Sequence, residues 1–320
     1  MIALKNFVLG LVLTAGLSLS AQESSDKQAT PLLKKISPHV YSYVGITGAS
    51  PAGNSFGANA GLIVGNDAVL VVDTLVSAHE AERFLKDIRA VTDKPVKYVA
   101  NTHYHLDHAW GNCVFAQNGA LIIGHEKLRG NKKLEESASY AIAHPEIFGM
   151  TPKDTEGTKF IFPNICFSQR MSIDLGGVTV ELSCLGPSHN DSSIIVYVPE
   201  DKTLFTGDAV FKGYHPFLAE GDLENWPKVI EALRKIPATA VIPGHGPLVK
   251  DSDFTDLIAY LKDFDVLAKE LSKGKKAEDA PAIAEEMIKR LPAQNRTELP
   301  GLVEMNLRSK YLPPPQVKAQ

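Results

Sequence analysis

Cysteine is scarce in this chain, with three residues among 320, an odd number that lacks the spacing of a disulfide framework. A bond between Cys166 and Cys184 is left open by the sequence. Cys113 directly follows a histidine-rich stretch, so a ligand role must be weighed. Free cysteine is commonly buried, and we expect a small buried residue at this position. The cysteine pattern therefore gives no support to a disulfide-stabilised scaffold.

An excess of positive charge is also missing, since 33 Lys and Arg stand against 37 Asp and Glu for a formal net charge of -4. Nucleic acid is therefore not an expected partner. The one dense basic cluster, Lys273 with Lys275 and Lys276, is typical of an exposed helix end. A hydrophobic content of 44% over this length allows one large core or two modest domains.

Long apolar runs are absent after the N-terminus, so we expect no stable membrane span in the mature protein. The first 21 residues have the features of a secretory signal: Lys5, an apolar stretch from Phe7 to Leu17, and small residues from Ser18 to Ala21. We expect cleavage after Ala21 and a periplasmic or secreted protein. An uncleaved N-terminal anchor is the alternative.

Composition then divides the chain into segments. We expect a signal peptide at 1–21, a linker at 22–37, a main domain at 38–250, packed C-terminal helices at 251–312 and a mobile tail at 313–320. The helices are indicated by apolar residues on one face, such as Leu257, Leu261 and Phe264, and by a helix start at Pro281.

Two distant parts of the main domain share one plan. In each, a predicted hairpin ends on an aspartate, Asp73 or Asp208, and is followed by a helix, a strand and a histidine. The predicted helices are Ser77 to Val91 and Leu223 to Lys235, and the predicted strands are Val96 to Ala100 and Thr239 to Ile242. This repeat indicates two similar layers of sheet and helix whose loops converge at one edge. Between the halves we expect a helix near Glu135 to Ile142 and two short strands around Gly176 and Gly177.

Seven residues at or near the ends of these elements have the chemistry of metal ligands. Imidazole nitrogens and carboxylate oxygens suit zinc, and a catalytic zinc site keeps a position for water. The segment from Asn101 to Asn112, NTHYHLDHAWGN, carries four of them, and the remaining three each stand beside glycine or proline or one residue away. The seven residues are His103, His105, Asp107, His108, His189, Asp208 and His245.

This set resembles the metallo-β-lactamase superfamily, whose motif H-x-H-x-D-H is followed by separated His, Asp and His. The resemblance covers roughly His39 to Val249. It implies an α/β fold, an αββα sandwich of two related halves, here with C-terminal helices added. It also implies two Zn²⁺ per chain, with Fe or Mn as an alternative in one position. His103, His105 and His189 would hold one ion, Asp107, His108 and His245 the other, and Asp208 would bridge them.

The implied activity is hydrolysis of a small-molecule substrate by a metal-bridging hydroxide, with Asp107 as the catalytic residue that orients it and helps to move its proton. His108 would be a ligand rather than a general base. The bond cleaved would be an ester, lactone, thioester or related carbonyl bond. The pattern is most similar to exported hydrolases of the glyoxalase II-like branch, which share the bridging aspartate.

Departures from other branches narrow the expectation. The β-lactam-hydrolysing branches typically have cysteine or serine at the position of Asp208, and lactonases usually have tyrosine at the position of Phe211. Diiron oxygen reductases generally have an acid in place of His105. A periplasmic β-lactamase is the alternative enzyme, and a non-catalytic metal-dependent binding module is the alternative of another class. The sequence does not decide the oligomeric state.

Other residues near these motifs are candidates for the site or its surroundings. His125 ends an apolar strand, and we expect a structural histidine there rather than a hydrogen-bond partner of a ligand. Tyr214 and His215 follow Asp208 closely enough to face a substrate, although such a loop is more often structural. Trp226 is expected to anchor a core.

Overall fold

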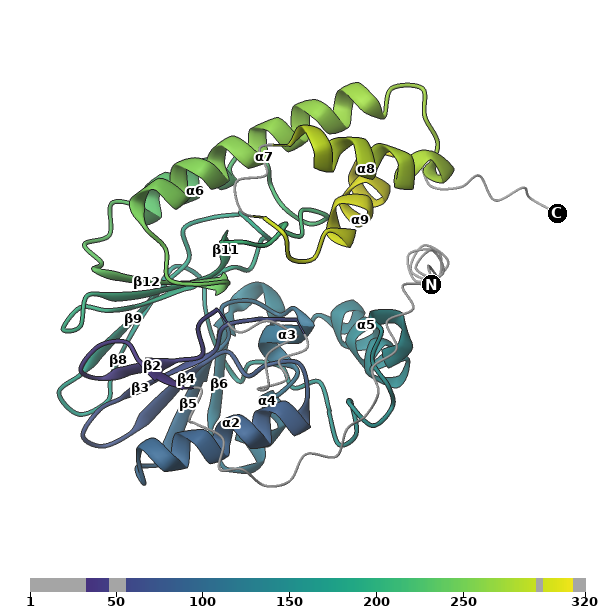
Figure 1. Ribbon diagram of the computed structural model, residues 1–320. Coiled ribbons are helices and arrows are strands. Elements are labelled where there is room, and N and C mark those ends of the chain that lie inside the picture. The colour runs from purple at the N-terminus through teal and green to yellow at the C-terminus, as the bar shows by residue number, and fades with distance from the viewer. Residues whose placement is uncertain (1–32, 46–55, 292–295, 313–320) are drawn as a thin grey trace, which may run out of the picture.

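The protein, represented by a computed structural model that describes residues 33–45, 56–291 and 296–312, has two sheets packed face to face with helices outside each (Figure 1). The first sheet has the strand order β1-β2-β3-β4-β5-β6-β7, and the second has the order β12-β11-β10-β9-β8. This arrangement confirms the predicted αββα sandwich. The strands of the first sheet are β1 Lys34–Lys35, β2 Val40–Ser42, β3 Gly61–Val64, β4 Val69–Val72, β5 Val96–Ala100, β6 Leu121–His125 and β7 Ile165–Phe167. Those of the second are β8 Arg170–Asp174, β9 Thr179–Ser183, β10 Ile195–Val198, β11 Thr203–Phe211 and β12 Ala240–His245.

The first half follows the predicted plan. Strands β3 and β4 form an antiparallel hairpin with Gly61 opposite Val72, and β4 then pairs in parallel with β5. Between them runs α2 (Ala78–Val91), whose first turn is capped because the Ser77 side chain accepts a hydrogen bond from the Glu80 amide. After β5 come the short helices α3 (Leu106–Ala109) and α4 (Asn112–Gln117), which were not predicted from the sequence.

The second half repeats this order with β10, β11, α6 (Trp226–Leu233) and β12. The prediction that Asp208 ends its strand is wrong. Strand β11 continues to Phe211 because β12 runs beside it as far as His245, with irregular register after Phe205. Helix α6 is shorter than predicted: Pro227 fits only its first turn, and Asp222 accepts amide hydrogen bonds in a turn before it.

Three apolar layers hold the sandwich together. Ile63, Leu70, Val180, Val196 and Ile242 lie between the two sheets. A second cluster packs α2 and α4 on the outer face of the first sheet, and a third packs α6 and the C-terminal helices on the second sheet. The alternation of inward and outward side chains along the strands is thus satisfied on both faces, which gives the nearly continuous burial of β4 and β11.

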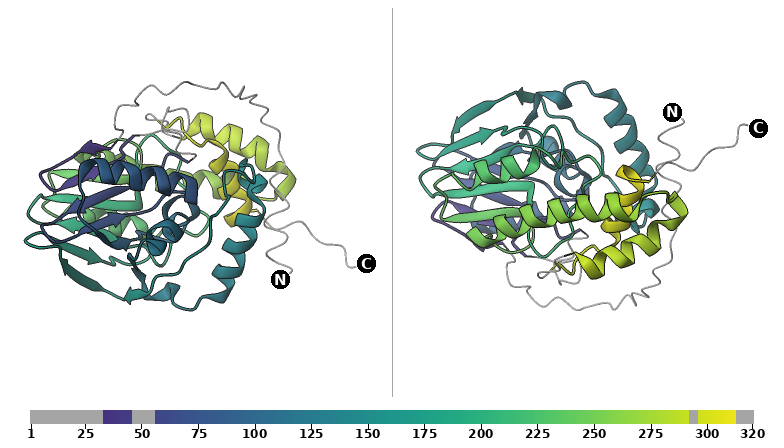
Figure 2. Two further views of the ribbon diagram at one scale, coloured as in Figure 1. Left: turned by 90° about the horizontal axis from the view of Figure 1, so that it is seen from below. Right: turned by 90° about the horizontal axis from the view of Figure 1, so that it is seen from above.

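Helices α7 (Asp251–Leu271), α8 (Ala280–Arg290) and α9 (Gly301–Lys310) follow the second half and lie together on one side of the molecule (Figure 2). Their buried residues, including Leu257, Phe264, Met287 and Leu307, belong to the same cluster as α6. Pro281 stands in the first turn of α8, as the sequence predicted. Helix α9 was predicted only as part of a helical segment, without bounds. The remaining α-helix between the halves, α5 (Lys132–Ala143), extends the predicted stretch from Glu135 to Ile142 by a few residues.

Several expectations fall on the ends of the chain. The expected signal at 1–21, most of the expected linker and the expected tail lie outside the described residues. Strand β1 pairs Lys34 with Ser42, so the sheet begins a few residues before the predicted start of the domain. In the described ranges, no helix combines the length and the apolar character that crossing a membrane requires. Cys113, Cys166 and Cys184 are free thiols, which answers the question of a bond between the last two.

Candidate metal centre

The loop after β5 carries the first four candidate ligands. His103 and His105 lie on the loop itself, His105 with extended backbone, and the chain then turns into the short helix α3, which carries Asp107 and His108. The H-x-H-x-D-H spacing therefore combines two loop residues with one helical turn. This change of backbone lets all four side chains point to the same place, where an all-strand or all-helix segment would separate them.

A pair of amides closes both ends of this loop. Asn101 donates from Nδ2 to Asn112 Oδ1 at 3.0 Å, and Asn112 donates from Nδ2 to Asn101 Oδ1 at 2.8 Å. Asn101 also donates to the His108 carbonyl at 3.1 Å. Both side chains are buried, so each bond is costly to lose. In the sequence, Asn101 and Asn112 stand at the two ends of the histidine-rich stretch and have no predicted role. Their pairing as buried amides is visible only in the fold.

Asp73, directly after β4, holds the loop that carries the first four ligands through hydrogen bonds to Thr102 and His108. Its Oδ1 accepts a hydrogen bond from the Thr102 amide at 2.7 Å, and its Oδ2 accepts from Thr102 Oγ1 and His108 Nδ1, both at 2.8 Å. Burial raises the pKa of Asp73, and the donors from His108 and Thr102 oppose that rise. Its backbone has φ of 60°, a left-handed conformation that aspartate tolerates better than most residues. Sequence reasoning recognised Asp73 as the counterpart of Asp208 but not as the hydrogen-bond partner of a ligand.

Four of the seven predicted residues form what we call the first ligand group: His103, His105, His189 and Asp208. Ligand atoms of the four lie within 4.8 Å of one another. Asp208 Oδ2 is 3.7 Å from His103 Nε2 and 3.4 Å from His189 Nε2. His105 Nδ1 faces His189 Nε2 at 2.8 Å. His189 comes from the loop before β10, so this group joins both halves of the sandwich.

The other three form the second ligand group: Asp107, His108 and His245. His245 Nε2 lies 3.3 Å from Asp107 Oδ2, and His108 Nε2 lies 3.6 Å from the same oxygen. Asp208 Oδ1 reaches this group as well, at 3.1 Å from His108 Nε2 and 3.4 Å from His245 Nε2. Asp208 therefore presents one oxygen to each group. All seven predicted side chains are brought together, and none of them lies elsewhere.

Burial and charge set the protonation of these residues. Burial is the largest cause that lowers the pKa of His103 well below its usual value and that of His189 to about 3, so both rings are neutral. Burial also opposes charge on His108 and His245. The carboxylates of Asp208 and Asp107 outweigh it, and they hold the pKa of His108 well above its usual value and raise that of His245 to about 9. A cluster that draws protons in this way attracts other cations to the same atoms.

Unsatisfied polar atoms test whether the residues fit a metal. His103 Nε2 and Asp208 Oδ1 are buried, and among the described residues neither has a hydrogen-bond partner. Buried polar atoms without partners are costly unless a ligand or ion satisfies them. The donor set of imidazole nitrogens and carboxylates is that of zinc and similar divalent ions. The residues present therefore fit two adjacent cations that share Asp208.

Glycine allows the close approach of the strands beneath Asp208. A Cβ at Gly244 would lie 1.9 Å from Asp208 Oδ1, and a Cβ at Gly207 would lie 2.5 Å from Thr102 Cβ. Gly207 also has φ of 50°. Any larger residue at either position would displace the shared carboxylate or the histidine loop.

The sequence profile described as the metallo-beta-lactamase superfamily matches residues 53–245, which include all seven candidate ligands. The chain belongs to this superfamily. Its fold agrees with a solved metallo-beta-lactamase from Pontibacter korlensis, with a TM-score of 0.55 and 23% identity over 72% of this chain and 98% of that one. This likeness concerns the fold alone.

Curated proteins that are similar to this chain have names that state different activities. A linear primary-alkylsulfatase from Pseudomonas is 22% identical over 63% of this chain and 45% of its own length. The alpha subunit of a 2,4-dinitroanisole O-demethylase from Nocardioides is 26% identical over 47% of this chain and 40% of its own length. A metallo-beta-lactamase type 2 from Bacteroides fragilis is 22% identical over 77% of this chain and 89% of its own length. The chain thus spans less than half the length of the first two.

The other residues weighed from the sequence lie outside the two ligand groups. His125 is buried, with Nε2 3.2 Å from the Ser168 carbonyl and Nδ1 accepting from the Lys127 amide, as expected of a structural histidine. Cys113 is buried and its thiol donates to the Trp110 carbonyl, so it is not part of the groups. Trp226 is a core anchor that donates from Nε1 to the Ala209 carbonyl.

Tyr214 and His215 are both buried, Tyr214 against the second ligand group and His215 against α7. The Tyr214 ring lies 5.1 Å from that of His245, and His215 Nδ1 lies 2.7 Å from Tyr260 Oη on α7. Burial is the largest cause that lowers the pKa of His215 to about 4, and the nearby Arg296 adds to it. These contacts make both residues structural neighbours of the centre.

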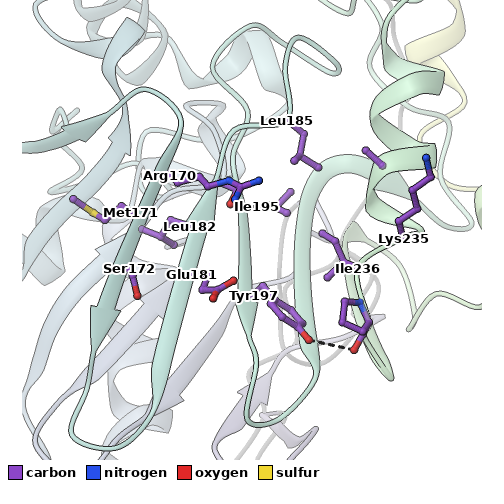
Figure 3. A pocket seen from close by; sticks show the side chains of 13 residues that line it. Arg170, Met171, Ser172, Glu181, Leu182, Leu185, Ile195, Tyr197, Lys235 and Ile236 are labelled. Atoms are coloured by element: carbon purple, nitrogen blue, oxygen red, sulfur yellow. Dashed lines mark hydrogen bonds between the residues drawn. The ribbon is translucent and has the colours of Figure 1, made fainter.

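A groove of about 570 Å³ lies on the outer face of the second sheet (Figure 3). It is lined by side chains of β8, β9 and β10, such as Arg170, Glu181 and Tyr197, and by Lys235 and Ile236 after α6. None of the seven candidate ligands lines it. We therefore place the candidate active site of this protein at the two ligand groups and not in this groove.

Proposed function

We propose that this protein is a dizinc hydrolase that cleaves an ester, lactone, thioester or related carbonyl bond of a small molecule. The observation that carries the proposal is the convergence of seven side chains into two ligand groups joined by Asp208. A protein that needed metal for stability alone would be served by one closed group of four ligands. Two adjacent groups with a shared carboxylate are the arrangement of hydrolytic two-metal sites.

Two bound divalent cations would supply a nucleophilic water near neutral pH and polarise the oxygen of the bond under attack. Asp107 then has a separate task, because its side chain is 11% exposed, more than those of His108 and His245 in the same group. It orients the attacking water by accepting its proton at a carboxylate oxygen and returns that proton to the leaving group. Burial opposes ionisation of Asp107, but His108 and His245 lower its pKa below the usual value, which keeps this acceptor ionised.

His108 does not take part as a general base. Its Nδ1 donates to Asp73, and its Nε2 points into the second ligand group between Asp208 and His245. Both ring nitrogens are therefore committed. The residue keeps its orientation through Asp73, as is usual for a metal-ligating histidine.

The test is a substrate panel with purified protein of measured metal content. The panel includes esters, lactones, thioesters and lactams, and also alkyl sulfate esters because of the alkylsulfatase relative. We expect about two zinc ions per chain and turnover of at least one carbonyl class. Asp107→Asn should retain the fold and the metal of the first ligand group while turnover falls by a factor of roughly 100 or more, the size of a lost proton-transfer residue. A protein with two zinc ions that turns over none of the panel would contradict the proposal.

A β-lactamase is the second candidate, favoured by the relative from Bacteroides fragilis that is matched over 89% of its length. Against it stands Asp208, where the β-lactam-hydrolysing branches typically have cysteine or serine. Expression in a sensitive bacterial host decides between the two. An unchanged minimum inhibitory concentration, with export verified, rejects the β-lactamase.

A binding module that uses metal only to hold a ligand predicts a different pattern. Such a protein would retain ligand binding after Asp107→Ala and would show no turnover in either form. We also propose export through residues 1–21 and a periplasmic or secreted location. Mass spectrometry of the mature protein should find Gln22 at the N-terminus, and an intact Met1 in the exported fraction would contradict cleavage.

A further inference from the structure

The loop at residues 213–221, which follows β11, contacts two histidines of the first ligand group from the side opposite their ligand atoms. His189 donates from Nδ1 to the Phe217 carbonyl at 3.0 Å. His105 donates from Nε2 to Glu220 Oε2 at 3.2 Å, and Tyr104 donates its hydroxyl to the same oxygen. The two histidines come from distant parts of the sequence, and one loop meets both.

These acceptors decide which nitrogen of each ring carries the proton. A carbonyl oxygen can only accept, so the neutral His189 ring keeps its proton on Nδ1 and leaves Nε2 bare. Glu220 Oε2 receives the Tyr104 hydroxyl as well as the His105 ring. A carboxylate oxygen in this position accepts, so it keeps a proton on His105 Nε2.

With the proton of His105 on Nε2, the bare nitrogens of the two rings face each other at 2.8 Å. The loop therefore holds both rings in the tautomer and orientation that a metal ion needs.

The C-terminal helices hold this loop in place. Asn306 on α9 is fully buried; it donates from Nδ2 to the Pro216 carbonyl at 2.9 Å and accepts from the Leu218 amide at 2.7 Å. These two bonds lie on either side of Phe217. Lys310 at the end of α9 donates to the Gly221 carbonyl at 2.6 Å, beside Glu220. Both acceptors of the loop are thus next to a contact with α9.

We propose that Glu220 and Asn306 are positioning residues of the metal centre, Glu220 by fixing His105 directly and Asn306 by fixing the Phe217 carbonyl that orients His189. This inference rests on the proposed dizinc site and adds to it a role for α9. It predicts that both residues act on the first ligand group and leave the second group unchanged. Partners of this kind typically change metal affinity by roughly 10- to 100-fold.

Zinc affinity, measured by competition with a chromophoric chelator in the absence of substrate, is the primary test. Glu220→Gln keeps the size of the side chain and loses the charge, and its side chain is 43% exposed, so the fold should not depend on it. We expect one of the two zinc ions to bind roughly 10- to 100-fold more weakly and the other to bind as before. Glu224→Gln is the matched control, because Glu224 is an exposed acid shortly after the loop and forms an ion pair with Lys228. Equal zinc affinity in the two variants would overturn the role of Glu220.

A spectroscopic readout separates positioning from a general loss of structure. Long-range proton–nitrogen NMR of the metal-free protein should show His105 protonated at Nε2 in the wild type and a mixture of tautomers in Glu220→Gln. The Co²⁺ absorption spectrum should change in intensity for one site and not for both. An unchanged tautomer and an unchanged spectrum would count against the proposal even if affinity fell.

For Asn306, the variants are Asn306→Asp and Asn306→Ala. Aspartate keeps the acceptor for the Leu218 amide but places an oxygen against the Pro216 carbonyl in a fully buried position, so both variants should bind zinc more weakly than the wild type. A loss of unfolding free energy with unchanged zinc affinity in both variants would show that Asn306 has a structural role only. If neither variant folds, Glu220→Gln decides the proposal. A protein that binds zinc as described but hydrolyses nothing would contradict the proposed function and leave this inference standing.

Discussion

The two ligand groups differ in how their histidines are held. In the first group, each outer nitrogen has a partner: His103 Nδ1 is 3.1 Å from Thr102 Oγ1, His105 has Glu220, and His189 has the Phe217 carbonyl. In the second group, His108 has Asp73, but the buried Nδ1 of His245 has no hydrogen-bond partner in the part of the chain that the structure describes. Partners on the outer nitrogens raise ligand basicity and fix orientation. The first group is therefore expected to bind its metal more tightly and to fill first.

The largest effect on both ligand groups is expected from removal of Asp208, the residue that they share. Asp208→Ala takes one oxygen from each group, so both should lose zinc and activity should fall by more than roughly 100-fold, since loss of an outer partner alone costs 10- to 100-fold. Metal analysis after dialysis against buffer, together with turnover, measures the effect. Retention of one tightly bound zinc would show that the groups are independent.

Asp73→Asn should give a smaller loss, directed mainly at the second group. Both carboxylate oxygens of Asp73 accept hydrogen bonds from donors. The side-chain amide of asparagine would therefore turn its NH₂ group toward one of these donors in either orientation. Asparagine also accepts the left-handed backbone, so the turn should survive. We expect roughly 10- to 100-fold weaker binding of one zinc. A smaller effect on the first group, through Thr102 and His103, is expected. Chelator competition resolves the two ions, and equal weakening of both would remove the distinction between the groups.

Acid should destabilise the folded protein through His215, which lies on the same 213–221 loop that contacts the first ligand group. The pKa of this ring is about 4 in the folded protein and 6.5 in the unfolded chain, so the unfolded chain binds more protons between these values. The contribution of neutral His215 to the unfolding free energy is complete above about pH 6.5 and is lost as the pH falls to about 4. The loss is on the order of 1–3 kcal/mol.

The measurement is urea unfolding of the metal-free protein at pH 7.5 and pH 5, for the wild type and for His215→Asn, which does not titrate. The wild type should lose more unfolding free energy between the two pH values than the variant. The same loss in both would assign the acid sensitivity to other groups. Tyr260 and Arg296 face His215 and remain unchanged in the pair.

The smallest effect is expected from Ser77→Ala, which removes the cap of α2 in the first half. Loss of such a cap costs about 1 kcal/mol of stability. Because α2 packs on the outer face of the first sheet, zinc affinity should be unchanged. Thermal unfolding and chelator competition on the same samples test this, and a change in zinc affinity would show that the groups respond to stability in general rather than to their own partners.

The sequence predicted the repeat of the two halves from local periodicity and all seven members of the ligand groups from residue types with few other uses, and the resemblance to the superfamily implied the closed sandwich. The boundary of β11 was missed, because its extension to Phe211 depends on pairing with β12, a contact between distant residues. Asp73, Asn101 and Asn112 were missed as supporting residues, since a buried hydrogen bond leaves no mark on composition or spacing. Glu220 and Asn306 belong to the same class.

The contacts of Asn306 also have a consequence in time. A ribosome makes the seven candidate ligands by residue 245, well before it reaches the helix that fixes the Phe217 carbonyl. A chain still being made, or one whose last helix has not docked, would therefore present its histidines without this support. We therefore expect tight metal binding late in folding, after the C-terminal helices have packed on the second sheet.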